Sequence, residues 1–222
     1  MRSDPVAREL RLRHGRSSNA VRHWCARAAT GSSVIRVFAS DTKPPLLQGL
    51  VVVPVEEMAG LRTREEFESW FEARLHEVAE TLQEKNRLNS RVQPGLTWGH
   101  TAKVLAIYIR AIVLHSRFFP DDIVARVKPW LFVPVDNIVI KRLETCGVRT
   151  PFRKIREIAS RADFYFVQNL LAERCDAGIA RVVFDDGWAD REESAAQQAL
   201  QPTSRARGVH RKSKHKPRVA RG

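Results

Sequence analysis

Thr101-Ala-Lys-Val-Leu-Ala-Ile-Tyr-Ile-Arg-Ala-Ile-Val-Leu114 is the run of residues that indicates the architecture of this protein most directly. It is apolar almost all round a helix, and Lys103 and Arg110 are its polar exceptions. A helix that is apolar on every side belongs at the centre of a protein, because a surface helix would show a polar face. Together with His100, the two cations fall on one side of this helix. We therefore expect a helical fold built around residues 101–114.

A second helix is predicted after Thr63. Thr63 and Glu66 have the spacing of a capping box, in which each side chain bonds the other residue's backbone. Apolar residues then recur at helical spacing, on Phe67, Trp70, Phe71, Leu75, Val78 and Leu82. This aromatic stripe indicates a core and not a cofactor site.

Start and stop signals predict further helices. A short one covers residues 120–129, and the next runs from the N-cap Asp136 to Gly147, a glycine of the kind that ends helices. Thr150-Pro151 has the same start signal, for a helix that carries Ile155 and Ile158. A last helix is predicted from Asp163.

The run from Leu46 to Val55 (LLQGLVVVPV) is the exception to the helical patterns. It is apolar, β-branched and flanked by prolines, which is typical of a short strand or of an extended segment that covers a core. Order should begin near Pro44. The fold class predicted for the whole chain is nevertheless mainly α, a compact multi-helix domain with disordered basic termini.

The chain carries a net charge of +13, and the charge is concentrated at its two ends. Residues 1–42 have a net charge of +5, residues 43–204 have none, and residues 205–222 have +8. We predict a basic, poorly ordered extension over 1–42, with a short helix over 21–29, then a helical domain over 43–200. A disordered basic tail follows over 201–222, because it has almost no apolar residues to bury.

Several classes of protein are not indicated. No apolar run has the roughly 18–20 residues that span a bilayer, and the N-terminus lacks the pattern of a secretory signal. Cys25, Cys146 and Cys175 have no metal-site or disulfide spacing, which favours reduced thiols and no metal or cofactor. We expect a cytoplasmic protein, although the Arg- and Ser-rich N-terminus leaves organellar import open.

Two segments carry the functional signal: Pro94-Gly-Leu-Thr-Trp-Gly-His-Thr-Ala-Lys-Val104 and Leu131-Phe-Val-Pro-Val-Asp-Asn-Ile-Val-Ile-Lys-Arg-Leu143. Together they resemble the helix-hairpin-helix DNA glycosylases. In that family a glycine-rich hairpin precedes one helix, and a later V-D-x-x-[VI] segment begins another. The resemblance covers residues 94–145 and implies a glycosylase-like helical core.

The resemblance also implies roles for particular residues. Asp136 would be the catalytic carboxylate, which stabilises positive charge on the sugar, and Lys103 the amine that attacks it. The target base would first be flipped out of the duplex. The residues expected to bind nucleic acid are Gly95, Trp98, Gly99, His100 and Arg110, together with Lys212 and Lys214 of the tail.

Each of these residues also has a structural interpretation. Asp136 has the position of an N-cap, Lys103 of a groove or surface cation, His100 of a hydrogen-bonded structural residue, Trp98 of a packed loop anchor, and Arg110 of a partner for a carboxylate. In the lyase-type members of the family the lysine lies two residues after the second glycine, whereas Lys103 lies four after Gly99. Two residues rotate a helix by about 200°, which leaves the direction of Lys103 open.

The function expected from these observations is duplex-DNA binding with excision of damaged or modified bases. The alternative is a non-enzymatic helical interaction module, of the kind found in defence systems, whose tails bind nucleic acid or an acidic partner. These two alternatives make different predictions for the tail. If it is the main DNA-binding element, removing its charge should abolish binding and its salt dependence.

Overall fold

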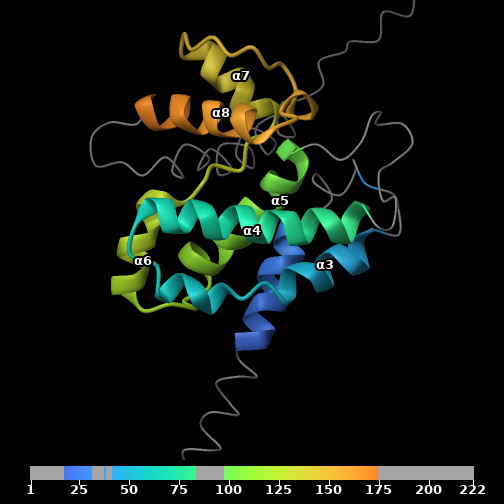
Figure 1. The fold of residues 1–222 in the computed structure, drawn as a ribbon, viewed down its shortest axis with the longest axis vertical. Coiled ribbons are helices and arrows are strands. Elements are labelled where there is room, and N and C mark those ends of the chain that lie inside the picture. Colours follow the sequence, from blue (N-terminus) through green and yellow to red (C-terminus); the bar gives the residue numbers. More distant parts are fainter. Residues whose placement is uncertain (1–17, 32–37, 39–41, 84–97, 175–222) are drawn as a thin grey trace, which may run out of the picture. The chain divides into compact units, whose positions relative to one another are not determined.

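The computed structural model describes residues 18–31, 38, 42–83 and 98–174 (Figure 1). All of them belong to one compact unit, Met1–Asp186. This part of the chain is 74% helical and contains no strand, which confirms the predicted mainly α, multi-helix class. No helix in the described ranges is both long and apolar enough to cross a membrane. The predicted tail over 201–222 lies outside the described residues.

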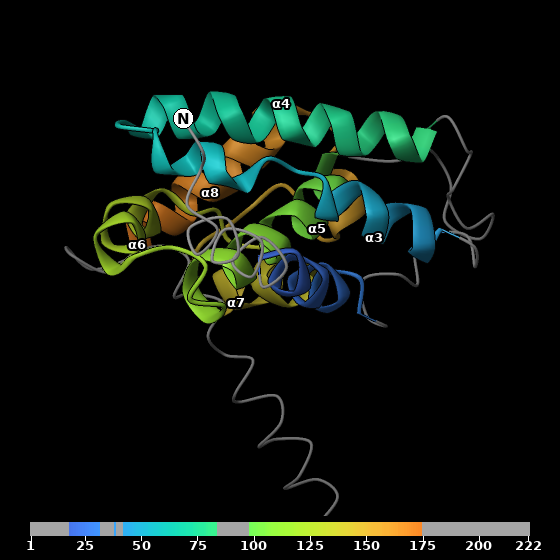
Figure 2. The ribbon, with the colours of Figure 1, turned by 90° about the horizontal axis from the view of Figure 1, so that it is seen from below.

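Helix α5 (Trp98–Arg110) lies at the centre of the packing and continues into the π-helical turn η2 (Ala111–His115). The helix predicted over 101–114 is therefore confirmed, with a start at Trp98. Every residue from Gly99 to Val113 is buried except Ile107, which is half-buried. Elements α4, α8 and η4 all contact α5, so its apolar sides are covered from several directions (Figure 2).

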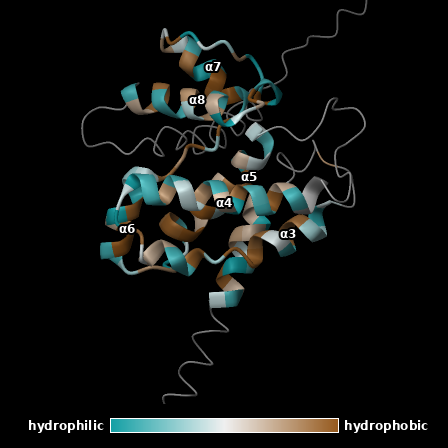
Figure 3. Ribbon diagram, in the orientation of Figure 1, coloured by the Kyte–Doolittle hydropathy of each residue, from teal (hydrophilic) through white to brown (hydrophobic). Residues whose placement is uncertain are grey.

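Helix α4 (Arg64–Gln83) begins at the predicted capping box. The Glu66 amide donates to Thr63 Oγ1 at 3.2 Å, and Glu66 Oε2 accepts from the amide of Arg62 at 2.6 Å and from that of Thr63 at 3.4 Å. These bonds satisfy amides that a helix start otherwise leaves without partners. Hydrophilic and hydrophobic residues alternate along α4, as expected for a helix with one buried face (Figure 3).

The buried face of α4 joins an aromatic cluster built from three parts of the chain. The Phe71 ring lies 4.7 Å from that of Phe132 and 6.0 Å from that of Phe164, measured between centroids. Phe132 and Phe164 are 5.1 Å apart, edge to face. Such geometries favour aromatic pairs beyond simple burial, so this cluster holds α4, the 131–135 segment and α8 (Arg161–Arg174) together.

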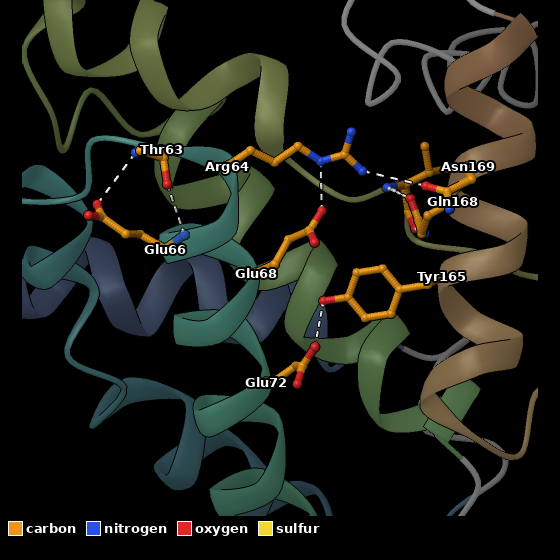
Figure 4. Close-up of polar contacts among 9 residues, drawn as sticks. Thr63, Arg64, Glu66, Glu68, Glu72, Tyr165, Gln168 and Asn169 are labelled. Atoms are coloured by element: carbon orange, nitrogen blue, oxygen red, sulfur yellow. Dashed lines mark hydrogen bonds and ion pairs between the residues drawn. The ribbon is translucent and has the colours of Figure 1, made fainter.

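Polar contacts add to the attachment of α8 to α4 (Figure 4). Glu72 Oε1 accepts from Tyr165 Oη at 2.8 Å and from Arg161 Nε at 2.6 Å. Arg64 donates to Glu68 on its own helix at 2.7 Å and to Asn169 on α8 at 3.5 Å. The two helices are thus joined by polar contacts at two places along their lengths.

The expectation of a strand or extended segment over 46–55 is wrong. Residues Lys43–Val51 form helix α3, and a 3-10 helix, η1, covers Val55–Ala59. Two prolines stand at the first positions of α3, where their fixed φ suits a helix and their missing N–H costs nothing. Leu46 and Leu50 are one helical turn apart and both are buried, so the helical conformation places both leucines in the core.

The poorly ordered extension predicted over 1–42 also requires correction. Residues 18–29 form a helix, which includes the short helix expected over 21–29. Its small residues Cys25, Ala26 and Ala29 are fully buried in the core. Arg22 donates to the carbonyls of Val51 at 3.0 Å and Val53 at 3.2 Å, which ties this helix to the end of α3.

Helix α6 (Asp121–Val127) and the 3-10 turn η3 (Lys128–Trp130) occupy the predicted 120–129 region. The chain then runs extended and buried through residues 131–135. Gln168, on α8, makes the backbone hydrogen bonds to this segment that a neighbouring strand would make in a β-sheet. Its Nε2 donates to the Val133 carbonyl at 2.8 Å, and its Oε1 accepts from the Val133 amide at 3.0 Å.

Helix α7 (Asn137–Thr145) has both predicted ends. Asp136 is its N-cap, and Gly147 follows with φ of 76°, the left-handed conformation that favours glycine after a helix. The helix predicted from Thr150-Pro151 does not form: the Thr150 hydroxyl accepts the Phe152 amide at 3.1 Å, as an N-cap would, but no helical turn follows it directly. Only the single 3-10 turn η4 (Ile155–Glu157) forms there. Helix α8 starts at Arg161, slightly before the predicted Asp163.

Candidate functional site

Lys103 on α5 and Asp136 at the start of α7 form an ion pair. Lys103 Nζ lies 3.1 Å from Asp136 Oδ2. The two side chains are only 10% and 13% exposed, so the pair sits just below the surface of the protein. The direction of Lys103, which its spacing from Gly99 left open, is therefore toward Asp136.

Asp136 has a second set of bonds on its other oxygen. Oδ1 accepts from the amides of Ile138 at 2.9 Å and Val139 at 3.0 Å, the pattern of an N-cap. The N-cap interpretation of Asp136 is thereby confirmed, and the ion pair is added to it. The Asp136 carboxyl group thus lies between the positive end of the α7 dipole and the Lys103 side chain. The result is a carboxylate that cannot rotate without losing three hydrogen bonds.

The first turn of α5 packs closely against η4. The Gly99 amide donates to the Ile158 carbonyl at 2.9 Å. A Cβ at Gly99 would lie 2.6 Å from the Ile155 carbonyl oxygen, a distance that real Cβ atoms do not reach. Gly99 is among the residues expected to bind nucleic acid, but its amide, the group that could donate to a phosphate, already donates to Ile158 inside the protein. Its lack of a side chain serves close packing instead.

The same turn η4 contacts the start of α7. The Ile155 amide donates to Asn137 Oδ1 at 2.9 Å. Asn137 is the residue after Asp136, and Lys103 is one helical turn after Gly99. The first turns of α5 and α7 and the 155–158 turn therefore converge beside the Lys103–Asp136 pair.

His100 was expected to bind nucleic acid, and the structure buries it instead. The residue is 4% exposed. Burial, and then the positive charge of Lys103, lower its pKa to about 4, so the ring is neutral at pH 7. A neutral, buried imidazole does not offer a cation to a phosphate, which corrects that expectation and agrees with the structural interpretation.

Trp98 and Arg110, the other α5 residues of the predicted interface, are at opposite ends of the helix. The half-buried Trp98 ring packs against the rings of His76 at 6.0 Å and Phe164 at 6.2 Å between centroids. These contacts agree with a packed anchor. Arg110 is 9% exposed, so little of its surface can contact DNA. Gly95, Lys212 and Lys214 lie outside the described residues.

The sequence reasoning overlooked a group of exposed cations between α7 and α8. Arg149, Arg153, Lys154 and Arg156 are all exposed, and Ile155 between them contacts Gly99 and Asn137 as described above. The signal was present in the sequence. The net charge of residues 43–204 conceals it, because acidic residues elsewhere in that range cancel these four positive charges.

Within the part of the chain that the structure describes, no group of three or more His, Cys, Asp or Glu side chains could hold a metal ion. Comparison with protein-family models, with curated proteins and with solved structures gave no match to this chain.

Proposed function

We propose that the chain binds duplex DNA and excises a base from it, with Asp136 and Lys103 as the catalytic residues. The observation that carries this proposal is the 3.1 Å contact between Lys103 and Asp136. These two residues come from separate segments of the resemblance to the helix-hairpin-helix glycosylases. An amine and a carboxylate in contact, nearly shielded from water, are the groups that such a reaction requires.

The proposed reaction uses the pair in both protonation arrangements. Lys103 first passes one ammonium proton to Asp136 Oδ2, which leaves a neutral amine. The amine nitrogen then bonds to C1′ of the flipped nucleotide, while the bond from C1′ to the base breaks and its electron pair leaves with the base. The proton held by Asp136 passes to the departing base. Asp136 is again a carboxylate, and it faces the positive nitrogen now attached to the sugar. The C1′–O4′ bond then breaks, O4′ takes its electron pair and one proton from that nitrogen, and the nitrogen lone pair forms the protonated Schiff base that borohydride reduces.

Excision is tested with a panel of duplexes that each carry one damaged or modified base. The wild type should release a base from at least one duplex, and Asp136→Asn should lose at least about a hundredfold in rate, because one catalytic electrostatic group is worth that much or more. Borohydride should trap a covalent adduct with the wild type and none with Lys103→Gln. Asp122→Asn and Lys128→Gln, two exposed changes on α6 and η3, are the matched controls and should behave as wild type.

Two results would contradict this proposal in different places. If the folded protein released no base from any of the duplexes, the proposed enzymatic function would be refuted. If a base were released but no covalent adduct were trapped, the attack by the Lys103 amine would be refuted. Water would then be the nucleophile, with Asp136 as the catalytic carboxylate.

A second candidate function is a non-enzymatic helical module whose basic tail binds nucleic acid. The observation that favours it is that both oxygens of Asp136 are engaged, Oδ1 by the cap and Oδ2 by Lys103, as in a purely structural pair. It predicts that replacing the eight Lys and Arg of 205–222 by Gln abolishes DNA binding and its salt dependence. Retention of wild-type affinity by that variant would exclude this candidate.

A further inference from the structure

Residues 149–156 (RTPFRKIR), here called the basic segment, concentrate positive charge on the folded part of the chain. The segment contains four cations and no carboxylate. Arg149, Arg153, Lys154 and Arg156 are all exposed. By contrast, α4 contains six Glu and two Arg, so the neutrality of residues 43–204 is a sum of oppositely charged segments.

The basic segment contacts the rest of the fold at several points, on α5, α7 and α8. The Ile155 amide bonds Asn137 Oδ1 at 2.9 Å, and the Ile155 backbone packs on Gly99. The Phe152 ring contacts the Phe166 ring of α8 at 6.3 Å. A positively charged segment that is held by the fold loses less entropy on binding than a free tail does.

Glu157, which directly follows the basic segment, is the acidic residue nearest to it in the sequence. Its Oε2 accepts from the backbone amides of Arg153 at 2.6 Å and Lys154 at 3.3 Å, and these bonds lower the pKa of its carboxyl. Glu157 therefore bonds the backbone of the segment, and the positive charges of Arg156 and Lys154 lower its pKa further, although within the described residues it forms no ion pair with the four cations. The cationic side chains project from a backbone that Glu157 helps to shape.

We propose that Arg149, Arg153, Lys154 and Arg156 bind the phosphates of a DNA duplex. Guanidinium groups match phosphate oxygens with two parallel hydrogen bonds, and exposed cations gain affinity by releasing counterions from the duplex. The choice of DNA rests on the proposed function, because the segment adjoins the first turns of α5 and α7 beside the Lys103–Asp136 pair. In this arrangement the segment, and not the Gly99 amide, supplies the phosphate contacts.

The test compares two full-length variants that lose the same charge. The first replaces the four cations of the basic segment by Gln. The second, the matched control, replaces Arg27, Lys43, Arg62 and Lys128, which are exposed and scattered over other segments. Affinity for a fluorescent duplex of about 20 base pairs is measured over a range of salt concentrations, since a protein that contacts phosphates binds more weakly as salt rises.

We expect the first variant to lose at least about tenfold in affinity and about 3 units of slope in a plot of log affinity against log salt. The control should lose less than about threefold, because general attraction alone is weakened. Circular dichroism verifies the fold of both variants. If the fourfold variant fails to fold, Lys154→Glu alone should still lower the slope by about 1. Equal losses in the two fourfold variants would overturn the proposal.

Two further measurements separate this inference from the catalytic one. The fourfold Gln variant of the basic segment keeps Lys103 and Asp136, so it should release a base at the wild-type rate once its concentration is raised until the duplex is saturated; binding and excision can then fail independently. Duplex RNA and vesicles of phosphatidylserine are offered as other polyanions. Tighter binding to either of them than to duplex DNA would overturn the assignment of DNA as the partner.

Discussion

Lys103 and Asp136, 33 residues apart in the sequence, share a hydrogen-bonded ion pair of 3.1 Å that links α5 to the first turn of α7. Because the pair is nearly buried, removing one partner leaves a charge in a place that water reaches poorly. Asp136 also caps α7, so its loss should cost more than the loss of Lys103.

We predict that Lys103→Met lowers the free energy of unfolding by about 2 kcal/mol and Asp136→Ala by about 3 kcal/mol. Asp136→Asn, which keeps an acceptor for the cap, should cost about 1 kcal/mol less than Asp136→Ala. Urea unfolding of the single and double variants measures these differences. Additive effects in the double variant would contradict the pairing, since contacting residues couple by about 0.5–3 kcal/mol.

Gly99→Ala should destabilise the protein, against the usual effect of alanine in a helix. The added methyl group would meet the Ile155 carbonyl oxygen at 2.6 Å, and the backbone of η4 would have to move. We expect a loss of about 2 kcal/mol in thermal or urea unfolding. The control is Gly60→Ala, where the nearest atom is 3.5 Å away and the change should stay within about 0.5 kcal/mol. A Gly99→Ala protein as stable as wild type would refute the close packing.

Gln168→Leu removes the side chain that satisfies both backbone groups of Val133. Leucine fills similar space but leaves a buried N–H and a buried carbonyl without their present partner, so we predict a loss of about 3 kcal/mol in urea unfolding. Gln48→Leu, an exposed change on α3, is the control and should have little effect. Equal stability of the two variants would show that water or another group replaces the Gln168 amide.

His100 should make the protein less stable as the pH falls. Its pKa is lowered to about 4 in the folded state, from 6.5, so the unfolded chain binds the proton first. The free energy of unfolding is fully retained above pH 6.5 and decreases as the pH falls toward 4, by up to about 3 kcal/mol. Urea midpoints at pH 7, 6 and 5 measure this decrease.

The pH dependence in that window should be much weaker in His100→Gln. His76→Gln, an exposed change on α4, is the matched control and should keep the wild-type dependence. A wild-type profile in His100→Gln would assign the effect to other groups.

Local signals predicted the parts of the fold that local chemistry determines. The Thr63–Glu66 capping box and the Asp136 cap are formed by residues close together in the sequence, and both helices start where those signals stand. Thr150-Pro151 had a comparable signal, yet the chain there forms only η4. Its backbone bonds go to Asn137 and Gly99, and contacts so distant in sequence leave no local pattern.

Other features depended on packing that composition hides. The helix over 18–29 buries only small residues, and the Arg-rich context around them favoured an unordered extension. At the candidate site, the resemblance selected Lys103 and Asp136, but neither its motifs nor helix geometry predicted that they meet. The packing role of Gly99 was missed because it follows from how tightly α5 is enclosed.

The aromatic cluster has a consequence for how the chain reaches its native state. Glu72 and Tyr165, beside Phe71 and Phe164, are 93 residues apart, so the core closes only after a long loop has formed. Contacts between residues so far apart in the sequence raise the contact order, which slows folding compared with a bundle of sequential helical hairpins. On the ribosome, Phe71 of α4 should lack its partner Phe164 until α8 has emerged from the exit tunnel. Nascent chains that end before residue 164 should therefore need protection from aggregation.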